Sequence, residues 1–213
     1  ELLKERHVDV KINSSITPKN IHDLDALCRI AEDKGTAWKF DTYMYPASRE
    51  RLSDFDLQSR LFPQEAAAAR VRIMEKKEKE NFLQAAARLL SLGDAPEGDA
   101  IPSPVKCRAG RSSYVINWQG KMRPCIMLTK PEADVFQLGF SEAWKEITNA
   151  VSNIRLNAKC SACTMREACQ SCAACAFLET GAFDGVPEYM CQYTKETLRQ
   201  LKDICEKKEG RNG

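Results

Sequence analysis

The sequence has little histidine, almost no net charge and no long apolar run. No apolar stretch reaches the roughly 18 residues of a membrane-spanning helix, so we expect no membrane partner. The 32 Lys and Arg residues against 30 Asp and Glu residues leave a formal net charge of +2. That balance argues against a polybasic arm and a nucleic-acid partner. The 2 histidines are too few and too far from the cysteines for a Cys2His2 zinc site. No signal-peptide pattern opens the sequence, and we expect a cytoplasmic protein.

Cysteine, in contrast, is abundant, with 10 residues in 213. Cys28 stands alone, and all the others lie between Cys107 and Cys205. Their density is below the roughly 8–10% that marks a disulfide scaffold. Because a reducing cytoplasm keeps thiols reduced, clustered cysteines favour metal binding over disulfides.

The N-terminal part of the sequence predicts a strand, a helix and a second strand. Residues 8–16 alternate apolar and polar side chains, as a half-buried strand does. Asn20 is a candidate cap for a helix that ends at Gly35, and a second strand covers about 37–45. Short connections between them predict a parallel unit of an α/β sheet. The chain opens on Glu1 rather than Met, and we expect it to be part of a longer protein.

The middle of the chain predicts a long helix, a linker and a hairpin. Alanine, glutamate, lysine and leucine predict one helix over 64–92, stopped by Gly93. Residues 93–104 have the composition of a linker, and we expect a domain boundary there. A β-hairpin then turns at Gly120, and Ser141 is expected to cap a further helix.

The strongest signal is the run Cys160-X2-Cys163-X5-Cys169-X2-Cys172-X2-Cys175. A two-residue gap lets two thiolates turn toward one metal. Thiolate is a soft ligand, so zinc and iron–sulfur clusters are the natural occupants. This run holds more cysteines than the four ligands of one zinc site, so we expect two sites with ligands drawn from elsewhere.

The complete cysteine pattern resembles the seven-cysteine SPASM domain, a C-terminal extension of radical S-adenosylmethionine (SAM) enzymes that holds auxiliary 4Fe–4S clusters. The likeness covers about 105–192. It rests on Cys107-X12-Gly120-X4-Cys125, on the run from Cys160 to Cys172, and on Cys191. More weakly, residues 8–46 are similar to late strand–helix–strand elements of the radical SAM partial barrel.

The resemblance implies a set of ligands for each of two auxiliary clusters. They are Cys107, Cys125 and Cys172 for cluster I, and Cys160, Cys163, Cys169 and Cys191 for cluster II. The family usually has three residues where two separate Cys169 and Cys172 here, so Cys175 could replace Cys172 or add a ligand. The fourth ligand of cluster I is not identified. Sulfatase-maturing members have an aspartate at the position of Ile126, which counts against a formylglycine-forming reaction with that base.

The implied fold is α/β: the terminal part of a radical SAM partial (β/α) barrel, then a small α+β SPASM domain with a β-hairpin. The corresponding ranges are 1–50 for the barrel part, 51–104 for a linker with a long helix, 105–192 for the SPASM domain, and 193–213 for a C-terminal helix and tail.

The Cys-X3-Cys-X2-Cys motif that binds the SAM-cleaving cluster occurs nowhere in the sequence. We therefore expect the C-terminal part of an enzyme, inactive alone, whose auxiliary clusters support radical modification of a peptide or protein. The resemblance implies SAM and its own 4Fe–4S cluster in the full-length enzyme, and an external electron carrier. Asn13 could face SAM or be a turn residue. The alternatives are a zinc-stabilised adaptor that binds a peptide, disulfides, and a thiol–disulfide redox protein.

Several other residues have ordinary structural explanations. A cysteine on an apolar helix stripe, such as Cys28 or Cys205, is usually a small buried side chain. Tyr43 and Tyr45 could line a substrate channel, although aromatic residues in strands usually belong to a core. Trp118 could cover cluster I or lie on the surface.

Overall fold

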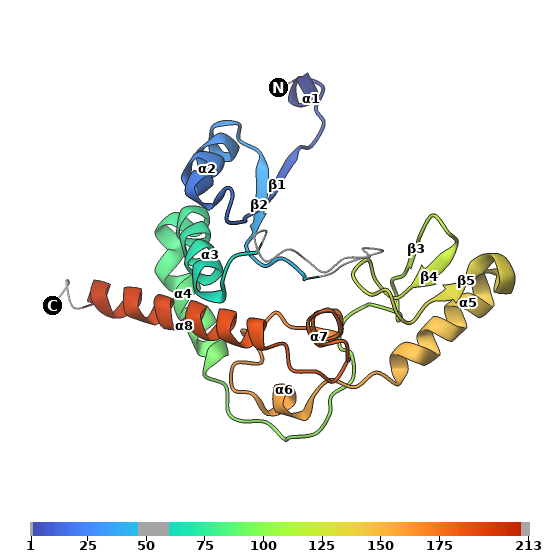
Figure 1. Cartoon of the computed structure of the whole chain (residues 1–213). Helices are drawn as coiled ribbons and strands as arrows, with labels where there is room; N and C mark the ends of the chain where they lie inside the picture. The colour runs from blue at the N-terminus through green and yellow to red at the C-terminus, as the bar shows by residue number, and fades with distance from the viewer. Residues whose placement is uncertain (1, 47–59, 210–213) are drawn as a thin grey trace. The chain divides into compact units, whose positions relative to one another are not determined.

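The structure is a computed structural model that describes residues 2–46 and 60–209, and the chain divides into two compact units (Figure 1). The first unit comprises Glu1–Met44, Asp56–Asp94 and Tyr189–Gly213, and the second comprises Tyr45–Phe55 and Ala95–Glu188. The main boundary falls between Asp94 and Ala95, within the segment 93–104 that has linker composition. The C-terminal helix, which the sequence had set apart, belongs to the first unit.

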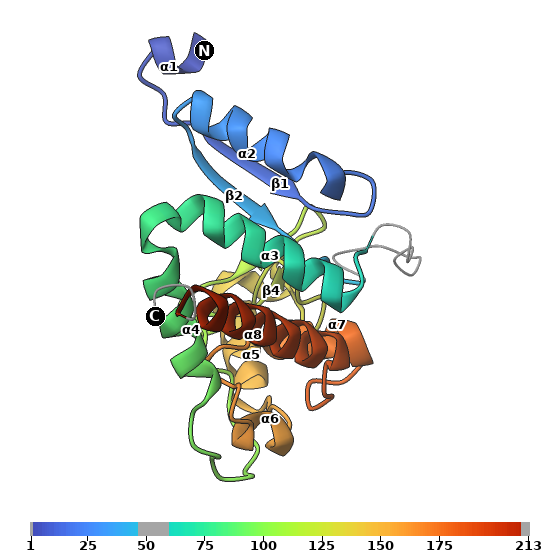
Figure 2. The ribbon, with the colours of Figure 1, turned by 90° about the vertical axis from the view of Figure 1, so that its left-hand side faces the viewer.

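The first unit begins with a parallel strand–helix–strand arrangement. After the short helix α1 (Leu2–Glu5), the elements are β1 (Lys11–Ser15), the 3-10 turn η1 (Ile21–Asp23), α2 (Leu24–Asp33) and β2 (Ala37–Asp41). The two strands pair in parallel, with Lys11 opposite Ala37. Helix α2 lies along this sheet and buries Leu24, Cys28 and Ala31 (Figure 2). The parallel unit expected from the sequence is confirmed.

Asn20 acts differently from the helix cap that the sequence predicts. Its side chain makes no capping hydrogen bond to η1. Instead its Oδ1 accepts the backbone N–H of Thr17 at 2.8 Å, and its Nδ2 donates to the Ser15 carbonyl at 3.1 Å. Asn20 therefore closes the turn that follows β1, a local bond that competes with helix capping.

Three further helices complete the first unit: α3 (Pro63–Glu78), α4 (Phe82–Gly93) and α8 (Glu188–Glu209). The single helix predicted over 64–92 is wrong. The chain breaks at Lys79, whose φ is +49°, and continues through the 3-10 turn η3 (Lys79–Asn81) before α4 begins. The break lets Phe82 pack in one core with Val71 and Leu201, from α3 and α8. Tertiary packing has overridden local helix propensity here.

The second unit combines a small antiparallel sheet with one long and two short helices. The strands are β3 (Val115–Ile116), β4 (Lys121–Arg123) and β5 (Ala133–Asp134), and the helices are α5 (Val135–Ser152), α6 (Ala158–Ala162) and α7 (Ala173–Thr180). Strand β4 pairs with both neighbours, and Gly120 has a φ of +74° in the turn before it. The predicted hairpin is confirmed.

The start of α5 differs from the sequence prediction at Ser141. Asp134 caps the helix, because its Oδ1 accepts the backbone N–H groups of Phe136 and Gln137 at 2.9 and 3.1 Å. Gly139 then interrupts the helix with a φ of +74°, and Ser141 lies beyond that kink. The predicted helix start at Ser141 therefore falls where the second helical segment begins, and the earlier segment capped by Asp134 was not predicted.

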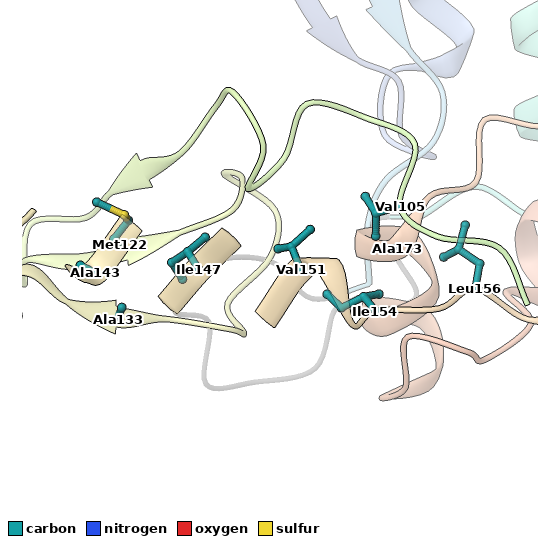
Figure 3. Packing of buried hydrophobic residues seen from close by; sticks show 9 residues of the cluster. All are labelled: Val105, Met122, Ala133, Ala143, Ile147, Val151, Ile154, Leu156 and Ala173. Atoms are coloured by element: carbon teal, nitrogen blue, oxygen red, sulfur yellow. The ribbon is translucent and has the colours of Figure 1, made fainter. Parts of the chain in front are cut away.

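A single row of apolar side chains forms the core of the second unit (Figure 3). It runs along α5, from Met122 on β4, through Ile147 and Val151, to Ile154 and Leu156 after the helix. Alanine supplies several of its other members, so the core is narrow. This core positions the hairpin and α7, which carry several of the predicted ligands.

The described strands form one two-stranded parallel sheet and one three-stranded antiparallel sheet, which makes the chain mixed α/β. Two strands do not close a barrel, and the partial barrel stays a prediction. Across residues 2–46 and 60–209, none of the helices has the length and apolar character needed to cross a bilayer.

Candidate metal centre

Three cysteines come from separate segments of the second unit, and two of them lie close enough to the third, Cys125, to affect the pKa of its thiol. Cys125 follows β4, Cys172 is the N-cap residue of α7, and Cys107 precedes the hairpin. Burial raises the pKa of the Cys125 thiol, the backbone N–H groups of Met127 and Leu128 lower it by donating to the sulfur, and the nearby Cys172 and Cys107 raise it again. These three are the residues that the sequence resemblance assigns to cluster I.

A tight turn of the backbone follows Cys107. The Arg108 carbonyl accepts backbone N–H groups from Arg111 and Ser113, at 3.0 and 3.1 Å. Gly110 has a φ of +67° in this turn, and a Cβ added there would lie 2.5 Å from the Val151 side chain. The turn therefore packs directly on the core of the second unit. Cys107, which precedes this turn, is exposed.

Tyr45 and Cys175 lie beside the same group of thiols. The Tyr45 side chain makes a hydrogen bond with Cys172. Burial raises the pKa of the Tyr45 phenol, and the neighbouring thiols of Cys172, Cys175 and Cys125 raise it further. Cys175 is 0% exposed within α7, one helical turn beyond Cys172. The structure thus puts both alternatives for the cluster I ligand, Cys172 and Cys175, near the same tyrosine.

A second group of thiols lies in the loop around α6. Cys160 is on α6, Cys163 caps its C-terminal end, and Cys169 follows in the next turn. Burial raises the pKa of the Cys160 thiol, Arg166 lowers it, and Cys169 and Cys163 raise it. The structure therefore places Cys163 and Cys169 near Cys160, and the sequence resemblance assigns all three to cluster II.

Asn157 and Arg166 hold this loop in place. The Asn157 side chain caps α6 by accepting the Lys159 N–H at 2.9 Å, and it donates to the Asp184 carbonyl at 2.6 Å. Arg166 donates its backbone N–H to the Cys163 carbonyl at 2.9 Å and its Nη1 to the Ser171 carbonyl at 3.0 Å. These bonds satisfy backbone groups in a segment that has little regular secondary structure.

The remaining predicted residues lie in the first unit. Cys191 is on α8 and is half-buried, and its assignment to cluster II stays a prediction. Asn13 lies in the middle of β1, exposed and opposite Lys39, so it is neither at a strand end nor in a turn. Its contact with SAM stays a prediction. Cys28 is 1% exposed on α2, and Cys205 packs at the edge of the α3–α4–α8 core, as expected of structural cysteines.

The donor chemistry of the second unit fits iron–sulfur clusters. All ten cysteines are in the described part of the chain, and all are thiols rather than disulfides. Within residues 2–46 and 60–209, no three Cys, His, Asp or Glu side chains converge closely enough to enclose a single ion. The ligands of a cluster bind separate iron atoms and so surround a larger volume than those of one ion. Two groups of thiols that do not close around a single ion are compatible with this larger volume, although the identity of the metal stays a prediction.

Sequence reasoning missed two features of the site. The backbone N–H groups of Met127 and Leu128 carry no residue-type signal, because any residue but proline supplies them. The sequence indicates only a channel or core position for Tyr45. Its position beside Cys172 depends on a contact between distant segments, which sequence patterns do not reveal. Trp118, considered as a cover for cluster I, is 83% exposed near the hairpin turn.

Comparison with known proteins gives one informative likeness. No protein-family model and no curated protein matches the chain. A solved structure described as a hexahistidine-tagged anSMEcpe with bound AdoMet matches with a TM-score of 0.61 at 16% sequence identity. The match covers 97% of this chain and 57% of that one. That neighbour is a radical SAM/SPASM maturase. At this identity the likeness concerns the fold alone, and it agrees coarsely with the resemblance in the cysteine pattern.

Proposed function

We propose that this chain is the auxiliary-cluster part of a radical SAM/SPASM enzyme that modifies a peptide or protein. The observation that carries the proposal is the grouping of cysteines into two sets, one from three separate segments and one from a single loop. The chain's fold is like that of a radical SAM/SPASM maturase. The cysteine order along the sequence supports the same assignment. The chain spans 57% of the length of that neighbour, so the whole enzyme's activity and substrate are part of the proposal.

The proposal assigns each group of thiols to one cluster. Cluster I would be held by Cys107, Cys125 and Cys172, with Cys175 adjacent as an alternative or additional ligand. Cluster II would be held by Cys160, Cys163, Cys169 and Cys191. When bound, such clusters accept and pass on single electrons. The chain's own contribution is to hold thiolates, to donate hydrogen bonds to their sulfurs and to limit their contact with water, which together set the potential.

The chain does not contain the Cys-X3-Cys-X2-Cys triplet, so cleavage of SAM would depend on residues outside this sequence. A substrate radical formed after SAM cleavage would give up an electron to the auxiliary clusters, and an external carrier would then accept that electron. Asn13 remains our candidate for a contact with SAM.

The deciding experiment is anaerobic production of the full chain, followed by assays for iron, sulfide and zinc. We expect iron and sulfide in equal amounts, with broad visible absorption and about two 4Fe–4S clusters per chain. The substitution Cys163→Ser should remove about half of the iron, because one cluster loses a ligand. The matched control Cys205→Ser, on the first unit's core, should keep it. Stoichiometric zinc without sulfide would instead identify the zinc-stabilised adaptor.

The same assay separates Cys172 from Cys175. If Cys172 is the cluster I ligand, Cys172→Ser lowers the iron content and Cys175→Ala leaves it unchanged. The reverse result assigns the ligand to Cys175, and a loss in both variants makes both cysteines ligands.

A further inference from the structure

Tyr45 lies beside the thiols assigned to cluster I. It directly follows Met44, the last residue of the first segment of the first unit, and it belongs to the second unit. Its side chain is half-buried and hydrogen-bonded to Cys172, with Cys175 and Cys125 close by. A single phenol therefore faces three of the cysteines that surround the proposed cluster.

The direction of this hydrogen bond follows from the chemistry of the two groups. A metal-bound thiolate sulfur has no proton and can only accept, whereas a neutral phenol has one O–H to donate. The Tyr45 O–H would therefore point at the Cys172 sulfur. Cys125 already accepts two backbone N–H groups, so both ligands have hydrogen bonds to their sulfurs.

Hydrogen bonds to ligand sulfurs favour the reduced cluster. Reduction adds negative charge to the iron–sulfur core and its ligands, and a donor aimed at a sulfur stabilises that charge. The two backbone donors on Cys125 cannot be removed by a side-chain substitution. The Tyr45 hydroxyl can be removed as a single atom, which makes its contribution measurable.

We propose that Tyr45 is a positioning residue of cluster I, whose hydroxyl donates to the Cys172 sulfur and raises the reduction potential of that cluster. This inference rests on the proposed function, since it requires that cluster I be present. It adds a role for a residue outside the cysteine pattern. The consequence is that Tyr45 makes cluster I a better electron acceptor.

The test compares the full chain with its Tyr45→Phe variant after anaerobic reconstitution. Redox titration followed by electron paramagnetic resonance gives the midpoint potential of each cluster. We expect one of the two signals to shift to a more negative potential, and the other to stay in place. The shift should correspond to about a tenfold change in the equilibrium, or about 59 mV for a one-electron couple. Iron content should not change.

Tyr114→Phe is the matched control, because Tyr114 is in the same unit but packs on Phe140 and Trp144. Neither potential should move in that variant. If Tyr45→Phe leaves both potentials unchanged with full iron content, the inference is wrong while the proposed function stands. If Tyr45→Phe loses iron, Tyr45 holds the cluster rather than tuning it, and the inference is again wrong. Absence of iron and sulfide from the unsubstituted chain defeats the proposed function itself.

Discussion

The two units of this chain are held together in different ways. The first has a parallel strand pair covered by α2, and three helices that share a core of Val71, Phe82, Ala86 and Leu201. Buried polar contacts add to it, such as the 2.8 Å hydrogen bond between Thr42 Oγ1 and the Tyr193 hydroxyl. The second has one narrow apolar row along α5, and its cysteine-bearing helices α6 and α7 have only 5 and 8 residues.

This difference shows where the stability of each unit comes from. Isolated helices shorter than about 12–15 residues are marginal in water, so α6 and α7 need tertiary support. Much of that support would come from metal–thiolate bonds, as in small metal-stabilised domains. The first unit obtains the corresponding support from its apolar core and from buried polar contacts within it. Three predictions test this contrast.

The largest expected effect is the response to cluster removal. Stripping iron from the anaerobically produced chain should accelerate amide hydrogen exchange in α6 and α7 on the order of a hundredfold or more, since metal binding there contributes to folding. Exchange in α3 and α4, which have none of the proposed ligands, should change little. Mass spectrometry of peptides from both units gives the comparison directly. Equal acceleration in both units, or none in α6 and α7, would contradict the contrast.

The second prediction tests the first unit by itself. Leu201 is 0% exposed in the α3–α4–α8 core, so Leu201→Ala should lower the opening free energy of these helices by about 3 kcal/mol. Iron content should stay unchanged, because no proposed cysteine ligand is altered. Hydrogen exchange measures the first effect and an iron assay the second. The exposed neighbour Lys202→Ala is the control and should change the opening free energy by less than about 0.5 kcal/mol.

The smallest expected effect concerns pH and α8. Hydrogen bonds from Arg199 and Gln200 lower the pKa of Glu196 from 4.5 to about 2. Because the folded pKa lies below the unfolded one, this contribution is present above pH 4.5 and is lost as the pH falls toward 2. Arg199 is well exposed, so solvent screening limits the contribution to about 0.5 kcal/mol.

Urea unfolding of the unsubstituted chain and of Glu196→Gln, followed by circular dichroism, measures this contribution. The variant should be less stable at pH 7, and the difference should shrink at pH 3. A difference that grows on acidification would show that the sign of the pKa shift is wrong.

Sequence patterns predicted the local elements that depend on near neighbours. The alternation over 8–16 and the helical spacing after it gave the parallel strand–helix–strand unit. Gly120 marked the hairpin, because its φ of +74° suits glycine. The one long helix over 64–92 failed at Lys79, where the advantage of burying Phe82 exceeds local helix propensity. The helix start predicted at Ser141 falls just after the kink at Gly139, whereas the preceding turn, which Asp134 caps, was not predicted.

The candidate site likewise has one part that sequence spacing predicts and one part that it does not. Cys160, Cys163 and Cys169 are close in sequence, so their spacing alone places them in one loop, and the structure adds only the supports from Asn157 and Arg166. Cys107 and Cys125 lie on either side of the hairpin, so its turn brings their segments together, but Cys172 is far from both in sequence. The addition of Cys172 was expected from the family resemblance, and in the structure both Cys172 and Cys107 lie near Cys125. Their role as ligands stays a prediction.

The amino-acid order by itself determined the thiol chemistry of the chain and the positions of its turns, because residue type and short-range spacing decide both. Only the tertiary structure decided that α8 returns to the first unit and that Tyr45 meets Cys172. Such contacts join segments that share no periodicity. They form where the burial of distant side chains outweighs the entropy of closing the chain between them.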